Sequence, residues 1–145
     1  MGFLKEMYAK SLAIKKCLKF AEDNCFKNIR DTLSKFEIPW EKALEENQTS
    51  KIRFVSAMDH VIFHSDRFEI LVDTRGFKPE EIKCNMTPTS VEVTAQTDAK
   101  IDNNVQKRMS LSRQYMLPQN AVPENGVCCL SQEGILLITA PWSNK

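Results

Sequence analysis

Two different spacings of apolar residues divide the chain. Between residues 14 and 36, apolar side chains recur every three or four positions, which is the spacing of one face of an α-helix. They are Ile14, Leu18, Ala21, Cys25, Ile29, Leu33 and Phe36. Pro39 ends the pattern, because proline lacks the N–H group that would continue a helix. We predict one long helix or two shorter ones within residues 3–38.

From about residue 51 the spacing changes to every second position. In Arg67–Asp73 and Ser90–Thr97, alternate residues are apolar, as in a strand with one buried face. Further strands are expected at Ile82–Thr87, Val105–Leu117, Val127–Leu130 and Ile135–Ile138. Short strands separated by turns predict an all-β fold, an immunoglobulin-like antiparallel β-sandwich. We therefore expect a helical N-terminal region and linker at residues 1–50, followed by a β-sandwich domain at residues 51–145.

The last expected strand is apolar on both faces. Leu136 and Ile138 would face the core of the sandwich, which leaves Ile135 and Leu137 on the outside. Such a second apolar face marks a contact surface for another molecule. Alternatively, the N-terminal helix covers it, and the sequence favours neither interpretation.

Composition narrows the classes of function. The 145 residues include 20 Lys+Arg and 19 Asp+Glu, so the formal net charge of +1 lacks the basic character of a dedicated nucleic-acid binder. The four glycines are too scattered to form a phosphate-binding loop. The first helical segment is rich in lysine, but acidic residues follow at once, so we expect it to pack on protein instead of membrane. We expect a protein of the cytoplasm, with the nucleus as a second location, that binds no nucleic acid.

Candidate chemistry is sparse. The five cysteines show no C-x-x-C spacing, so we expect small apolar residues instead of a disulfide framework or a zinc site. Adjacent Cys128 and Cys129 would point to opposite faces of a strand, and the outward thiol is a candidate for redox sensitivity. His60 and His64 have acidic and serine neighbours, but a catalytic triad needs groups that converge in space. We expect no enzyme activity, no cofactor, and neither a catalytic nor a metal site.

Three blocks of the sequence resemble a known family. They are Asp66-Arg67-Phe68 with Val72-Asp73 and Phe77–Lys83, then Arg113–Pro118, and finally Leu130–Pro141 with a G-x-L-x-[IV]-x-x-P pattern. Together and in this order they resemble the α-crystallin domain of small heat-shock proteins, over roughly residues 60–142. The resemblance implies an ATP-independent chaperone (a holdase) that binds partly unfolded proteins and prevents their aggregation. The alternative is a non-catalytic interaction or structural module that binds a specific partner or co-assembles with a longer small heat-shock protein.

The resemblance also implies surfaces for assembly. In animal members the long strand pairs with its copy in a second subunit, so we expect a homo-oligomer, at least a dimer. The expected dimer-interface residues are Val105, Lys107, Met109, Leu111, Arg113 and Tyr115. In the family, a groove between the strands that match Ile82–Thr87 and Val127–Leu130 accepts a short apolar I-x-I/V segment from a neighbour's C-terminal tail. No such motif follows Pro141, which speaks against the usual cross-linking through that tail.

Two further sets of residues are candidates for contact with clients or subunits. The expected groove and client contacts are Cys84, Met86, Val127, Cys129, Ile135 and Leu137. For Cys84, Met86, Val127 and Cys129, a plain role in the core is an equal alternative. The expected N-terminal client or assembly contacts are Phe3, Leu4, Met7, Leu18, Ile29, Leu33 and Phe36.

Overall fold

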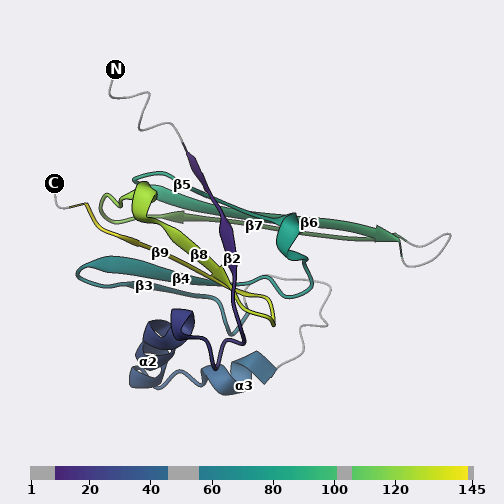
Figure 1. The fold of residues 1–145 in the computed structure, drawn as a ribbon, viewed down its shortest axis with the longest axis horizontal. Coiled ribbons are helices and arrows are strands. Elements are labelled where there is room, and N and C mark those ends of the chain that lie inside the picture. The colour runs from purple at the N-terminus through teal and green to yellow at the C-terminus, as the bar shows by residue number, and fades with distance from the viewer. Residues whose placement is uncertain (1–8, 46–55, 101–105, 144–145) are drawn as a thin grey trace.

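The chain forms two facing β-sheets with helices on the outer side of one of them (Figure 1). The computed structural model describes residues 9–45, 56–100 and 106–143. The first sheet has the strand order β1-β5-β6-β7, and the second has the order β2-β8-β9-β4-β3. The strands are β1 (Lys10–Leu12), β2 (Ile14–Lys16), β3 (His60–Phe63), β4 (Arg67–Asp73), β5 (Ile82–Met86), β6 (Ser90–Lys100), β7 (Gln106–Met116), β8 (Val127–Leu130) and β9 (Ile135–Pro141). The helical elements are α2 (Lys27–Lys35), α3 (Trp40–Glu45) and the short 3-10 turns η1 (Asn24–Phe26), η2 (Pro79–Glu81) and η3 (Pro123–Asn125).

The predicted antiparallel β-sandwich is confirmed. β4 covers the residues that the alternating pattern indicated, and the remaining expected strands occur in β5 to β9. Neighbouring strands pair antiparallel except β2 and β8, which are parallel. β6 and β7 form a long hairpin that extends beyond the rest of the sandwich (Figure 1).

The N-terminal region differs from the prediction. Residues 10–16 are not helical but form β1 and β2, which belong to different sheets. Leu12 and Ile14 are two positions apart, a spacing that lets both pack against the sandwich core from an extended segment. Helix α2 begins only at Lys27. Local helical spacing is a weak signal, and pairing with β5 and β8 overrides it here.

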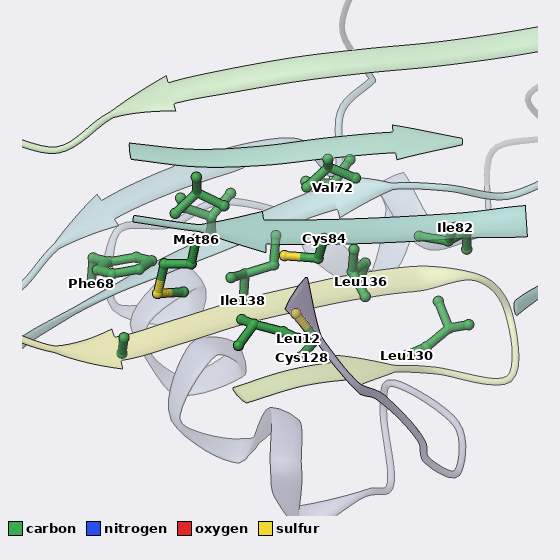
Figure 2. Packing of buried hydrophobic residues seen from close by; sticks show 14 of the residues in the cluster. Leu12, Phe68, Val72, Ile82, Cys84, Met86, Cys128, Leu130, Leu136 and Ile138 are labelled. Carbon is green, nitrogen blue, oxygen red and sulfur yellow. The ribbon is translucent and has the colours of Figure 1, made fainter. Parts of the chain in front are cut away.

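The space between the sheets holds the main hydrophobic core. Figure 2 shows Leu12, Cys84, Met86 and Cys128 within this layer, together with side chains of β4 and β9. Its buried members are Leu12, Phe68, Ile70, Val72, Phe77, Ile82, Cys84, Met86, Val91, Val93, Ala95, Leu111, Ala121, Cys128, Leu130, Leu136, Ile138, Ala140 and Trp142. A residue of the N-terminal segment, Leu12, is therefore part of the core of the sandwich.

A second apolar cluster lies on the outer face of the second sheet, under α2 and α3 (Figure 1). Ile135 and Leu137 of β9 belong to it and are 0% and 2% exposed. Its other buried members are Phe20, Phe26, Ile29, Leu33, Ala43, Met58, Leu71 and Cys129. The N-terminal helical region thus covers the second apolar face of β9, and this face is not an open contact surface.

Candidate functional site

The chain fills its own groove between β5 and β8. In β1, Leu12 pairs with Cys84 of β5, and two residues later Ile14 of β2 pairs with Cys128 of β8. The segment therefore bridges the two sheets along one side of the sandwich (Figure 1). Contact there is close, because a Cβ atom placed on Gly126 would lie 3.1 Å from Leu12 Cδ1. Leu12-Ala13-Ile14 has two branched apolar residues at the spacing of an I-x-I/V segment, a likeness that the sequence analysis did not use.

The structure divides the predicted groove and client contacts. Cys84 and Met86 lie in β5 directly beside β1, and Val127 is 44% exposed at the start of β8. The prediction is wrong for three others. Cys129 faces the second cluster, and Ile135 and Leu137 lie under the N-terminal helical region. Side chains alternate across a strand, so Cys128 and Cys129 cannot both face the groove.

β7 is the edge of the first sheet within the described residues. Leu111 is buried in the core, and Met109 and Tyr115 pack partly buried against it, so these predicted interface side chains point into the sandwich. Burial raises the pKa of Tyr115 to about 12. Arg113 is half-buried, and its Nη1 donates a hydrogen bond to the Ser112 carbonyl oxygen at 3.0 Å. Contact through this strand would therefore depend on its backbone.

Two predicted interface positions cannot be placed in the same way. Val105 lies outside the described residues, and Lys107 belongs to β7.

The opposite edge, β3, exposes apolar side chains that the sequence analysis missed. Val61 is 43% exposed and Phe63 is 49% exposed. β3 pairs with β4 on one side and, among the described strands, has no partner on the other. The sequence carried no clear signal, because Val61, Ile62 and Phe63 form a continuous apolar run that does not indicate which side chains face outward. This edge combines open backbone groups with exposed apolar surface.

The predicted N-terminal contacts divide according to their place in the fold. Ile29 and Leu33 are fully buried in the second cluster, so they do not face solvent. Leu18 and Phe36 are 57% and 61% exposed. Phe3, Leu4 and Met7 lie outside the described residues.

Polar groups around β3 and β4 make bonds within the fold. His64 Nε2 lies 2.6 Å from Glu69 Oε1, and Trp142 Nε1 donates to the His64 carbonyl oxygen. The carboxylate of Asp59 accepts hydrogen bonds from the backbone N–H groups of Ser56 and Asp73. These contacts fix strand ends and do not assemble a nucleophile with a base.

A buried ion pair connects the sandwich to α3. Arg75 Nη2 lies 2.7 Å from Asp73 Oδ2, and Arg75 Nη1 donates to the Leu44 carbonyl oxygen at 2.8 Å. Burial alone would raise the pKa of Asp73, but the hydrogen bonds and charge of Arg75 outweigh it and hold this pKa below its usual value. The ionised carboxylate is therefore part of the folded structure.

Three cysteines that are distant in sequence meet beside β2. The sulfur atoms of Cys17, Cys25 and Cys129 all lie within 4.8 Å of one another. Burial and the nearby Cys17 and Cys25 raise the pKa of Cys129 to about 12. Cys128 lies apart, in the core, where a side-chain hydrogen bond with Cys84 and burial raise its pKa. The prediction of opposite faces for Cys128 and Cys129 is confirmed, but neither thiol is exposed.

The fold is that of a small heat-shock protein with an α-crystallin domain. Residues 60–145 match the Hsp20/alpha crystallin family, and the chain belongs to this family. Over 77 residues it is 32% identical to Protein lethal(2)essential for life of Drosophila melanogaster, covering 53% of this chain and 41% of that protein. Over 76 residues it is 33% identical to the alpha-crystallin B chain of Squalus acanthias, covering 52% of this chain and 43% of that protein. The chain thus spans less than half the length of these two relatives.

Solved structures show the same fold. The rat alpha crystallin domain matches with a TM-score of 0.51 and 31% identity, over 61% of this chain and 92% of that chain. Stress-induced protein 1 from Caenorhabditis elegans matches in fold with a TM-score of 0.53 and 24% identity, over 59% of this chain and 88% of that chain. Within the parts of the chain that the structure describes, no helix is long and apolar enough to cross a membrane. Membership of the family supports a chaperone-type role in general.

Proposed function

We propose that this protein is an ATP-independent holdase, a non-enzymatic chaperone that binds partly unfolded proteins and prevents their aggregation. Membership of the small heat-shock protein family supports this function. The observation that carries it is the edge strand β3, which exposes Val61 and Phe63 beside backbone groups without a described partner. Partly unfolded proteins expose apolar segments and unpaired strand edges. An edge such as β3 can bury the apolar segment and pair with the open strand.

The filled groove supplies a second, conditional client site. β1 and β2 have three residues each, so few backbone bonds hold the segment in place. Displacement of Leu12 and Ile14 would open β5 and β8 to an extended client segment. Binding of a client segment there would replace the N-terminal segment of β1 and β2, and this exchange would need no nucleotide.

A light-scattering assay tests the holdase function. Equimolar protein should slow the heat-induced aggregation of a model client. Val61→Ser with Phe63→Ser should weaken this effect severalfold, whereas Met116→Ser, at an exposed apolar position of β7 away from β3, should have less effect. Both variants should first be shown to unfold at the temperature of the wild type. If equimolar wild-type protein leaves client aggregation unchanged, the holdase proposal is rejected.

The open edge of β7 supports a further proposal about assembly. Two copies of β7 could pair through their backbones and form a homodimer. The same edge could accept the long strand of a longer small heat-shock protein, which is the alternative function as an interaction module. Native mass spectrometry of the protein alone and mixed with such a protein distinguishes the two, because the interaction module predicts mixed dimers in preference to homodimers.

The cysteines support a place of action. All five are free thiols in the structure, which suits a reducing compartment. We therefore place the chaperone in the cytoplasm, with the nucleus as a second location. Fluorescence microscopy of the tagged full chain tests this assignment, which secretion into the medium would contradict.

A further inference from the structure

The cluster of Cys17, Cys25 and Cys129 is the feature that the proposed function leaves unexplained. Three thiol sulfurs within 4.8 Å of one another are close to the arrangement around a metal ion. Thiolates at about 2.3 Å from an ion lie about 3.8 to 4.0 Å apart. Each separation therefore needs to shorten by no more than about 1 Å, which side-chain rotation can supply.

Hydrogen bonds hold Cys17 and Cys25 in this arrangement, and Cys129 is fixed by its place in β8. Asp23 accepts from the backbone N–H groups of Leu18 at 2.7 Å and Cys25 at 2.8 Å, which folds the loop between Cys17 and Cys25 back on itself. The Cys17 N–H donates to the Leu130 carbonyl oxygen at 2.8 Å, which places Cys17 beside β8. The cluster is therefore preorganised by contacts that do not involve its sulfur atoms.

The chemistry of the cluster favours a soft ion. All three ligand atoms are sulfur, which selects Cu(I) or Zn²⁺ over the hard ions Mg²⁺ and Ca²⁺. Zn²⁺ prefers four ligands, whereas the group of described residues supplies three. Lys15 Nζ lies 3.7 Å from Cys25 Sγ, where its charge offsets half of the excess negative charge of three thiolates around a monovalent ion. Cys17 and Cys25 are only partly buried, which leaves a path for the ion to enter.

We propose that Cys17, Cys25 and Cys129 form a three-coordinate site for Cu(I). Cys17 follows β2, Cys25 lies in η1, and Cys129 lies in β8. A bound ion thus cross-links the N-terminal segment to the sandwich. Binding holds Leu12 and Ile14 in the groove, so the ion stabilises the closed form of the client site.

An anaerobic titration of the reduced, metal-free full chain tests the site. Cu(I), supplied as its acetonitrile complex, should bind at one ion per chain and give a near-ultraviolet thiolate-to-copper band. Competition with the chelator bicinchoninate gives the affinity. Cys17→Ser and Cys129→Ser should each lower that affinity at least tenfold. Cys84→Ala is the matched control, because Cys84 belongs to the core and not to the cluster, and it should bind as the wild type does.

Two further measurements keep the test independent of chaperone activity. X-ray absorption should find three sulfur neighbours around copper. Hydrogen exchange should show slower exchange in β2 of the copper-bound wild type, and no change in Cys17→Ser. Circular dichroism checks that each variant is folded, with Cys17→Ala as the second variant at the partly exposed position.

Several outcomes would overturn the site. Unchanged affinity in Cys17→Ser, loss of binding in Cys84→Ala, or only two sulfur neighbours would each exclude the three-sulfur arrangement. Retention of Zn²⁺ while Cu(I) passes to the chelator would overturn the choice of ion. Failure of the aggregation assay leaves this test unaffected, because none of its readouts uses a client.

Discussion

The backbone of Leu12 pairs with that of Cys84, and this single register places the N-terminal segment inside the groove of the sandwich. The Leu12 side chain is 7% exposed and belongs to the main core. The N-terminal segment of the same chain therefore fills the groove, without a second subunit. Substitution of Leu12 should weaken the packing of this segment without changing β5 and β8, the strands that form the groove.

Leu12→Ala should lower the free energy of unfolding by about 2 to 3 kcal/mol, because it removes a buried side chain at the side of the core. Ser11→Ala, at the exposed neighbouring position of β1, should change it by less than about 0.5 kcal/mol. Urea unfolding followed by circular dichroism measures both. Equal effects of the two substitutions would show that the segment does not occupy the groove in solution.

Leu33→Ala should destabilise the protein by about 2 to 4 kcal/mol, because Leu33 of α2 is fully buried over the second sheet. Phe36→Ala removes a larger side chain only three positions later, but this side chain is 61% exposed, so its effect should be within about 0.5 kcal/mol. Thermal unfolding compares the stability of the two variants, and binding of a hydrophobic dye compares their exposed apolar surface. A larger loss for Phe36→Ala would mean that α2 presents a different face to β9.

Asp73 should make stability depend on pH in the acid range. Its folded pKa lies below the usual value, so its contribution is complete above the unfolded pKa of about 3.9 and is lost as the pH falls through the folded pKa. Asp73→Asn should cost about 2 to 3 kcal/mol at pH 7, because the largely buried Arg75 guanidinium loses the charge of the Asp73 carboxylate. This substitution should also make the free energy of unfolding decrease less steeply below pH 4.

Asp66→Asn is the control for this prediction. Asp66 pairs with Arg67 at 2.9 Å, but its side chain is 70% exposed, so the cost should be about 0 to 1 kcal/mol. Acid unfolding monitored by tryptophan fluorescence compares the two variants. An acid-unfolding curve of Asp73→Asn parallel to that of the wild type would show that Asp73 is not the titrating group.

Dimerisation through β7 should be visible in hydrogen exchange. Amides of β7 that bond to β6 should exchange slowly at any protein concentration, because that pairing lies within the chain. The alternate amides, which point away from β6, should become protected as the protein concentration rises. If they exchange freely in a sample that native mass spectrometry shows to be dimeric, the dimer uses another surface.

The strands of the sandwich could be predicted because their apolar spacing repeats over several residues. β4 occupies Arg67–Asp73 as predicted, but the expectation of one buried face is wrong for it, because the second cluster and neighbouring polar groups also bury Glu69, Leu71 and Asp73 on the other face. β1 and β2 could not be predicted in the same way, because each has three residues and pairs with strands much later in the chain. Leu12 and Ile14 fit a strand spacing, but Ile14 also fits the helical spacing that continues to Phe36.

The residues of the candidate sites were harder to predict from the sequence than the strands were. The cysteine cluster joins positions 17, 25 and 129, and only the folded arrangement brings their sulfur atoms together. The covering of Ile135 and Leu137 depends on how α2 lies on the second sheet, which spacing alone does not define. The family resemblance proposed Cys84 and Met86 as groove contacts, and the structure places both in β5 beside β1, fully buried in the main core.

The parallel pairing of β2 with β8 has a consequence for synthesis. Translation makes β2 near the beginning of this sequence, but its partner strand emerges only after most of the chain has left the ribosome. Contacts between such distant positions form slowly, because a long loop must close first. Until then, Leu12 and Ile14 remain an unprotected apolar segment on the nascent polypeptide. The nascent chain would therefore depend on chaperones, or on fast completion of its last strands, to avoid aggregating before it folds.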